Sequence, residues 1–313
     1  MPQRMKAISS EKKSELESPG AYEFSRLRGI VDDSLAGYVS ANACGAPSLL
    51  REAMEYSLMA GGKRMRPILL LCAGKAVGGE EGMLLPFACA VEFLHTYSLI
   101  HDDLPSMDDD DFRRGKPTSH KVFGEGMAML AGDALLTEAF RIMAESRVAS
   151  GDPGKAVRAI ADIARAAGAE GMVGGQQLDI AAENDDAKAI GAEKIGLMKT
   201  AALLASCARV GGILGGGSSP QIATLGEFGT RLGLLFQITD DILDEIASFE
   251  EMGKGTAKDR IRGKRTYTVD HGLEAARERV DALGREAFES LAAFGAEANP
   301  LRELVCTVQG RRS

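Results

Sequence analysis

Two clusters of aspartate, far apart in the chain, carry the strongest chemical signal in the sequence. Carboxylates packed side by side repel one another and raise each other's pKa values, so a folded chain keeps such clusters most readily when a multivalent cation lies between them. Magnesium is the cation we expect, because it prefers oxygen ligands and commonly binds together with phosphate. The aspartates that we predict to bind the metal are Asp102, Asp103, Asp108, Asp240, Asp241 and Asp244.

Basic residues follow each aspartate cluster, and a site that only stored a cation would not need them. The segment 113–116, with two Arg and one Lys, follows the first cluster, and Lys254, Lys258 and the stretch 260–265 follow the second. A further basic segment, Gly61-Gly62-Lys63-Arg64-Met65-Arg66-Pro67, lies upstream. Oxygen ligands beside Arg and Lys side chains are typical of a site that binds a polyanion through metal bridges.

The spacing of the second cluster predicts that it lies on a helix. Asp240 and Asp244 are four residues apart, and Gln237, Asp241 and Asp244 follow the three-and-four spacing of a helical face. One face of the helix therefore presents an amide and carboxylates together.

The first cluster is predicted to follow a helix end. Pro105 disfavours continuing a helix past Asp103, so we expect Asp108 to return to the metal site on an irregular turn. Asp102 and Asp103 would then lie at a helix C-terminus, where the helix dipole disfavours each negative charge by about 0.3–1 kcal/mol. This cost favours a functional role over solvated helix ends.

Composition favours a helical fold in one continuous domain. The 313 residues are 45% hydrophobic and 26% charged, with 5% aromatic residues and no Trp. Segments rich in Ala, Leu, Glu and Lys predict helices, for example at 87–103, 126–148 and 220–246, and the glycine-rich stretch 211–220 is predicted to be a loop. Residues 1–20 are polar and expected to be frayed, and residues 21–313 are predicted to form the domain.

Charge and cysteine content argue against some partners and locations. The net charge of −8 disfavours nucleic-acid binding, because phosphate backbones are bound by broad basic surfaces. The five cysteines lack metal-ligand spacing and are interpreted as reduced thiols. The N-terminus lacks the apolar core of a signal peptide, and the longest apolar runs fall short of the roughly 20 residues that span a bilayer. We therefore expect a cytoplasmic protein without stable membrane insertion.

The chain resembles the trans-isoprenyl diphosphate synthases, and among them the bacterial short-chain group that makes farnesyl or geranylgeranyl diphosphate. The segments that carry the resemblance, in order, are 61–67, 95–118, 175–179, 199–200 and 236–244. The resemblance implies an all-α, single-domain bundle of roughly ten or more helices around a central active-site cavity, normally as a homodimer. It also implies about three magnesium ions.

The resemblance further implies a reaction that joins an allylic diphosphate, dimethylallyl or geranyl, to isopentenyl diphosphate. The allylic C–O bond breaks, the carbocation alkylates the double bond of isopentenyl diphosphate, and a proton is lost. Stabilisation of the cation is assigned to the Lys199 carbonyl, Thr200 and Gln237. Binding of the allylic diphosphate is assigned to Arg113, Lys199, Lys254 and Lys264. Binding of isopentenyl diphosphate is assigned to Lys63, Arg66, His95 and Arg114.

Product length is expected to depend on the floor of the hydrophobic pocket. A helix rises about 1.5 Å per residue, so Tyr97 and Ser98 lie roughly 6–8 Å below Asp102. Bacterial farnesyl-producing relatives carry an aromatic residue five positions before the first aspartate, as this chain does with Tyr97. We therefore expect farnesyl diphosphate, with geranylgeranyl diphosphate as the alternative. The alternative to Tyr97 as the floor is a floor elsewhere, for example at Ser98, at Leu94 or around residues 127–130.

Two other classes of protein were weighed against this interpretation. A terpene cyclase would not need the second diphosphate site that Lys63 and Arg66 indicate, and a non-catalytic partner subunit would be expected to lose Lys199, Gln237 or one aspartate cluster. The chain departs from the family pattern at Thr268, where Pro is usual, and in its C-terminal segment 309–313, which is not the commonest basic ending. The second departure leaves open whether the C-terminus closes over the second substrate.

Overall fold

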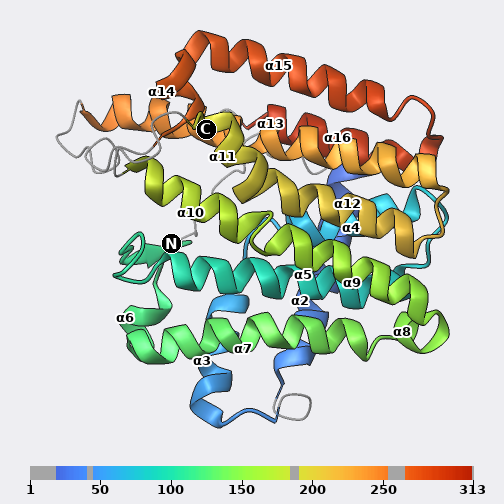
Figure 1. Cartoon of the computed structure of the whole chain (residues 1–313), viewed down its shortest axis with the longest axis horizontal. Coiled ribbons are helices and arrows are strands. Elements are labelled where there is room, and N and C mark those ends of the chain that lie inside the picture. Colours follow the sequence, from blue (N-terminus) through green and yellow to red (C-terminus); the bar gives the residue numbers. More distant parts are fainter. Residues whose placement is uncertain (1–18, 41–44, 184–189, 253–264, 312–313) are drawn as a thin grey trace, which may run out of the picture.

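The structure of the protein is a computed structural model that describes residues 19–40, 45–183, 190–252 and 265–311. These residues form a bundle of helices with one short hairpin, which confirms the predicted all-α fold (Figure 1). The helices are α2 (Pro19–Val39), α3 (Ser48–Leu58), α4 (Met65–Lys75), α5 (Glu81–Asp102), α6 (Ser119–Phe123), α7 (Glu125–Ala144), α8 (Arg147–Gly151), α9 (Pro153–Ala167), α10 (Met172–Glu183), α11 (Ala192–Gly196), α12 (Ala202–Leu214), α13 (Ser219–Met252), α14 (Tyr267–His271), α15 (Leu273–Ser290) and α16 (Asn299–Gln309).

Three short elements complete the fold. A π-helical turn, Leu197–Ala201, joins α11 to α12, and a 3-10 turn, Ala296–Ala298, precedes α16. The hairpin pairs β1 (Phe112–Arg113) antiparallel with β2 (Lys116–Pro117). Most of the frayed segment predicted at residues 1–20 lies outside the described residues, and the division of the chain into that segment and one domain stays a prediction.

Helices α5 and α12 form the centre of the bundle. Helix α5 packs against α4 and α7, and α12 packs against α4, α9 and α13 (Figure 1). Phe87 and Phe93 on α5 and Leu203 on α12 are buried, as expected for helices that are surrounded by other helices. Since the first aspartate cluster begins at the end of α5 and the second lies within α13, this central packing positions both clusters.

Among the described residues, two helical stretches are long and apolar enough to cross a membrane by length and composition alone, Glu81–Asp102 and Ala192–Leu214. Polar residues such as Glu92 and Lys199 interrupt these stretches, which is why uninterrupted apolar runs in the sequence are shorter. In the two stretches, 67% and 72% of the apolar window is buried inside the protein. This burial is what the core helices of a bundle require.

The predicted glycine-rich loop at 211–220 was wrong in its first part, because α12 continues to Leu214. A Cβ atom at Gly211 would lie 2.4 Å from the carbonyl oxygen of Leu70, and one at Gly215 would lie 2.5 Å from that of Gly74. Glycine is therefore used here to let the backbones of α12 and α4 touch.

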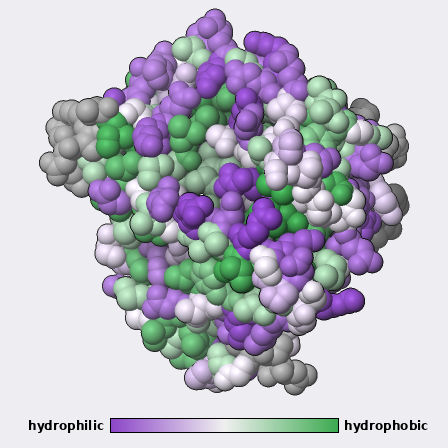
Figure 2. Space-filling model, turned by 45° about the vertical axis from the view of Figure 1, so that its right-hand side comes forward, coloured by the Kyte–Doolittle hydropathy of each residue, from purple (hydrophilic) through white to green (hydrophobic). Residues whose placement is uncertain are grey.

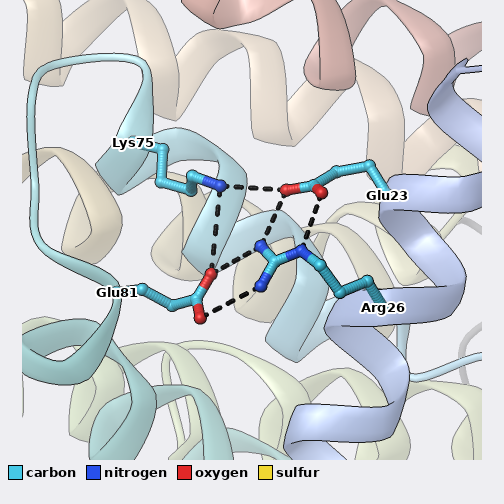
Figure 3. A network of polar contacts seen from close by, with 4 residues as sticks. All are labelled: Glu23, Arg26, Lys75 and Glu81. Carbon is cyan, nitrogen blue, oxygen red and sulfur yellow. Dashed lines mark hydrogen bonds and ion pairs between the residues drawn. The ribbon is translucent and has the colours of Figure 1, made fainter.

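The surface is polar, with local ion-pair networks. Figure 2 shows a face on which hydrophilic and hydrophobic side chains are interspersed. In one network, Arg26 of α2 lies 2.7 Å from Glu81 at the start of α5 and 2.8 Å from Glu23, and Lys75 of α4 lies 2.9 Å from Glu23 (Figure 3). Hydrogen bonding to Arg26 lowers the pKa of Glu23 to about 2. This network connects the ends of three helices.

Candidate active site

The first aspartate cluster lies where α5 ends, as predicted. Asp102 is the last residue of α5, and the chain then turns through Pro105 without continuing the helix. The Asp108 backbone N–H donates to the Asp102 carbonyl oxygen at 2.8 Å, so this turn returns Asp108 to the helix end. The irregular turn predicted from Pro105 is confirmed.

Asp103 lies against Arg113 and, unlike Asp102, does not line the large cavity of the site. Its carboxylate is 2.6 Å from the Arg113 guanidinium, which β1 of the hairpin presents, and only 3% of Asp103 is exposed. Asp102, by contrast, lines the large cavity. The structure thus gives Asp103 the task of orienting Arg113, and a metal bound to Asp103 would have to share this carboxylate with the guanidinium.

The large cavity has a volume of about 670 Å³ and combines charged with apolar walls. Arg66, His95, Asp102, Lys199 and Thr200 contribute polar groups. The apolar lining comes mainly from α5 and α10 and consists of Tyr97, Leu99, Met172, Val173, Ile180 and Ala181, with Met107 from the turn after α5. A cavity of this composition suits a long apolar chain attached to an anionic head group.

Both residues predicted to set chain length, Tyr97 and Ser98, line this cavity. The Tyr97 ring packs edge-on against His101, with ring centroids 5.8 Å apart. His101 in turn lies 3.1 Å from the Met129 carbonyl oxygen of α7. A Cβ atom at Gly132 would lie 2.1 Å from the His101 ring, so this glycine makes room for it. The structure therefore places His101 in the packing between α5 and α7.

Lys199 and Thr200 lie on the π-helical turn, which the sequence analysis did not predict. Such turns carry one extra residue and frequently occur at functional sites. The Lys199 ammonium lies 2.6 Å from the Asp179 carboxylate on α10. Lys199 also lines a second cavity of about 110 Å³ together with Gln237 and Asp241. Lys199 therefore lies where the cavity of the first cluster meets that of the second.

A chain of hydrogen bonds holds Gln237 in one orientation. The Thr200 hydroxyl donates to the Gln237 side-chain oxygen at 2.7 Å, and the Gln237 amide donates to Asp241 at 2.9 Å. The other carboxylate oxygen of Asp241 accepts from the Tyr267 backbone N–H at 2.8 Å. Because the Thr200 hydrogen is directed to Gln237, the lone pairs of its oxygen are available to a positive charge in the cavity.

The glycines of the 175–179 segment let α10 approach the π-helical turn. A Cβ atom at Gly175 would lie 2.2 Å from the Lys199 backbone nitrogen and 2.7 Å from the Met198 carbonyl carbon. Only glycine permits this contact. The predicted motif thus has a steric role that the sequence analysis did not identify.

Asp240 of the second cluster has a partner from the C-terminus. Its carboxylate lies 2.7 Å from the guanidinium of Arg311, which also lies over the Phe236 ring, 4.8 Å from the centroid. Arg311 was not predicted to have a role, and its only signal in the sequence is that the C-terminal segment is basic. Asp244, one turn further along α13, is exposed.

The residues assigned to isopentenyl diphosphate form a group of three cations and one histidine. Burial lowers the pKa values of Lys63, Arg66 and Arg114. Burial also lowers the pKa of His95 well below its usual value, with further lowering by Arg66 and Arg114. Among the described residues, the Nε atom of Arg66 is buried without a hydrogen-bond partner. These groups are arranged as expected for a site that is complete only when an anion is bound.

The basic segment itself is held by Arg64, which is 3% exposed. Its guanidinium donates to Glu92 at 2.7 Å, to Asp32 at 2.8 Å and to the Leu58 carbonyl oxygen at 2.8 Å. Its backbone is left-handed, with φ of 48°, and α4 begins directly after it. Arg64 fixes the turn from which Lys63 and Arg66 extend.

The carboxylates fit a magnesium site in chemistry but do not converge tightly on their own. Within the described ranges, no group of three or more His, Cys, Asp or Glu side chains could hold a metal ion by itself. Burial raises the pKa of Asp102 to about 6, and burial also raises that of Asp240. Carboxylates whose charged form is disfavoured by burial suit magnesium that takes its other ligands from water and phosphate. The six metal ligands stay predictions, and the predicted Lys254 and Lys264 lie outside the described residues.

Comparisons with known proteins agree with this site. A family model described as polyprenyl synthetase matches residues 47–295. The chain is 52% identical over 257 residues to the heterodimeric geranylgeranyl pyrophosphate synthase large subunit 1, chloroplastic, of Arabidopsis thaliana, covering 80% of this chain and 69% of that protein. It is 49% identical over 273 residues to geranylgeranyl pyrophosphate synthase 9, chloroplastic, of the same plant, covering 85% and 75%.

Solved structures give the same picture. An FPP/GFPP synthase from Zymomonas mobilis superposes with a TM-score of 0.81 at 34% sequence identity, covering 93% of this chain and 98% of that one. A geranyltransferase from Legionella pneumophila superposes with a TM-score of 0.80 at 31% identity, covering 93% and 96%.

Proposed function

This chain belongs to the polyprenyl synthetase family, and on that premise we propose that it joins an allylic diphosphate to isopentenyl diphosphate and makes geranylgeranyl diphosphate. The transferase class follows from the family and from the structural neighbours. The sequence analysis expected farnesyl diphosphate as the product. Its alternative, geranylgeranyl diphosphate, is better supported, because two curated relatives of about half identical sequence are named for that product.

The proposal rests on one observation: basic side chains and an aspartate line the same cavity, and burial disfavours the charged form of each. Arg66 and His95 line the cavity as part of a basic group whose pKa values are lowered by burial. Asp102 lines the same cavity with a raised pKa. A diphosphate bound directly by the cations, and a second diphosphate bound at the aspartates through a divalent cation, would satisfy both sets of charges.

The residues divide the reaction between them. Magnesium, held by Asp102, Asp108 and Asp240 with the other predicted aspartates, would neutralise the diphosphate as it leaves. Arg113 and Lys199 bind the allylic diphosphate, whose C–O bond breaks with both electrons going to oxygen. The Thr200 oxygen and the Lys199 backbone carbonyl face the resulting carbocation without bonding to it.

The second substrate completes the condensation. Lys63, Arg66 and Arg114 hold its diphosphate so that its double bond attacks the cation and forms the new C–C bond. A proton is then lost. By the resemblance, the diphosphate that has left accepts this proton. The apolar wall formed by α5 and α10 receives the growing chain and keeps water from the cation.

Farnesyl diphosphate remains the second candidate product because of one observation. Tyr97 lies in the cavity wall with 7% of its surface exposed, and an aromatic ring there shortens the space available to the chain. Differences of one methylene in such pockets are worth about 1–3 kcal/mol, so a single ring can shift the product but need not decide it.

We also propose a cytoplasmic homodimer. Large apolar side chains are exposed on three helices: Val122 on α6, Met129 and Leu130 on α7, and Val157 on α9. Association with a second copy of the chain would cover these side chains. Gel filtration with light scattering tests the dimer, and cell fractionation tests the location, which rests on the interpretation of the cysteines as reduced thiols.

The proposed reaction is tested by incubating the purified protein with Mg²⁺, isopentenyl diphosphate and one primer, either dimethylallyl, geranyl or farnesyl diphosphate. Chromatography of the dephosphorylated products should give geranylgeraniol from all three primers. Farnesol as the end product, with farnesyl diphosphate left unextended, would support the second candidate. No elongation from any primer, in a preparation that is folded by circular dichroism, would refute the reaction.

A further inference from the structure

Arg311 occupies a position that the proposed reaction needs for a metal ion. Its guanidinium lies 2.7 Å from Oδ1 of Asp240, one of the predicted metal ligands. The contact joins the segment directly after α16 to the middle of α13, two elements that pack against each other. The side chains of Arg311 and Asp240 are 21% and 32% exposed, so water screens this ion pair only partly.

The position of Arg311 is held by few contacts besides this ion pair. The guanidinium lies over the Phe236 ring, 4.8 Å from its centroid. Its Nη1 atom is buried and has no hydrogen-bond partner among the described residues. Arg311 is also close enough to the Lys63 ammonium to repel it, and this repulsion adds to burial in lowering the Lys63 pKa. Asp240 pairs with Arg311 and also attracts Lys63, so it offsets the repulsion between these two cations.

A magnesium ion bound to Asp240 would remove the attraction that holds Arg311 and leave the repulsion from Lys63. The carboxylate oxygen that accepts from Arg311 would become a metal ligand, and the guanidinium would then face the metal ion and Lys63 without its partner Asp240. Positive charges that lie close together in a site partly shielded from water repel one another strongly. The ring of Phe236 alone attracts a guanidinium only weakly.

We propose that Arg311 is an exchangeable counter-ion of Asp240, so that magnesium binding at the second aspartate cluster displaces the guanidinium and moves the C-terminal segment. The inference rests on the proposed function for the metal at Asp240. In the metal-free protein Arg311 shields the carboxylates of α13 from one another. In the metal-bound protein the C-terminus leaves Asp240, and the position of the C-terminus reports whether the second cluster is loaded.

An introduced tryptophan can report on the C-terminus without background fluorescence from other tryptophans, because the chain contains none. Ser313→Trp introduces a single tryptophan two residues beyond Arg311. Titration of this variant with Mg²⁺ and inorganic diphosphate should shift its fluorescence emission, whereas the same titration in the Ser313→Trp, Arg311→Gln double variant should start near the metal-bound emission and change little. An emission that stays unchanged while calorimetry shows Mg²⁺ binding would overturn the proposal.

Metal affinity gives an independent measurement. Arg311→Gln removes the competing cation, so its apparent dissociation constant for Mg²⁺ in the presence of inorganic diphosphate should fall by about three- to tenfold relative to the unchanged protein. Arg277→Gln, an exposed arginine on α15, is the matched control and should not change it. Equal affinities in all three proteins would overturn the exchange.

These measurements separate the inference from the function on which it rests. If the unchanged protein elongates primers but Arg311→Gln binds Mg²⁺ like the unchanged protein, only the exchange is wrong. If the unchanged protein neither binds Mg²⁺ with diphosphate nor elongates a primer, the proposed function is wrong as well.

Discussion

Replacing Asp102 by Asn should stabilise the metal-free protein while abolishing prenyl transfer. Burial raises the pKa of Asp102 from 3.8 to about 6, with a smaller opposing effect of Lys199. In a group with a raised pKa the folded state holds its proton more tightly than the unfolded state does. The stability of the metal-free protein should therefore fall as the pH rises from about 4 to about 6, and should stay low above it.

The size of the change in the free energy of unfolding follows from the pKa shift of Asp102. A difference of about 2 pKa units corresponds to about 3 kcal/mol at neutral pH, because each unit is worth 1.36 kcal/mol. An uncharged Asn does not incur this cost. Asp102→Asn is thus expected to raise the free energy of unfolding by up to about 3 kcal/mol at pH 7.5 in EDTA, and by almost nothing near pH 4.

Urea unfolding followed by circular dichroism, repeated at several pH values in EDTA, measures this difference. Asp281→Asn on α15 is a suitable control, because Asp281 is exposed. A variant that is less stable than the unchanged protein at pH 7.5, or a gain that does not depend on pH, would refute an uncompensated carboxylate at Asp102. Retained prenyl transfer in the same variant would refute its role in binding the metal.

Three further changes test other parts of the site. Tyr97→Ala should lengthen the product, because it removes a ring from the cavity wall, and chromatography of the product alcohols that shows an unchanged spectrum would exclude Tyr97 from chain-length control. Gly175→Ala should lower kcat by about a hundredfold with the fold intact, because its Cβ would lie 2.2 Å from the Lys199 nitrogen; steady-state kinetics with an unchanged kcat would contradict this. Arg64→Gln should lower the free energy of unfolding by about 3–5 kcal/mol, because it leaves Glu92 buried without its partner, and a loss below about 1 kcal/mol in urea unfolding would show that the pair is not needed.

Features set by local chemistry could be predicted from the sequence. Pro105 had to end α5, and a three-and-four spacing had to place Gln237 and Asp241 on one helical face, where they are hydrogen-bonded at 2.9 Å. The approximate positions of the helices followed from the composition and periodicity of the segments in the same way. These inferences needed only information from residues within one or two helical turns.

Features set by contacts between distant segments could not be predicted. Gly211 resembles a loop residue until the Leu70 carbonyl of α4 is placed beside it. Asp103 resembles its neighbour Asp102 until the hairpin brings Arg113 to it. Arg311 lies in a C-terminal segment whose sequence gives no indication of a contact with Asp240. In each case the deciding partner comes from another element of the bundle.

The apolar character of α5 and of the stretch that includes α12 also affects how the chain reaches its fold. Both are as apolar as segments that cross a membrane, and they are covered only after α4, α7, α9 and α13 have docked on them. Until then, partly folded chains expose long apolar helices that can associate with one another or with lipid. Refolding from denaturant should therefore lose yield steeply as protein concentration rises, and efficient production of this protein in a cell should depend on chaperones that bind these two segments before the bundle closes.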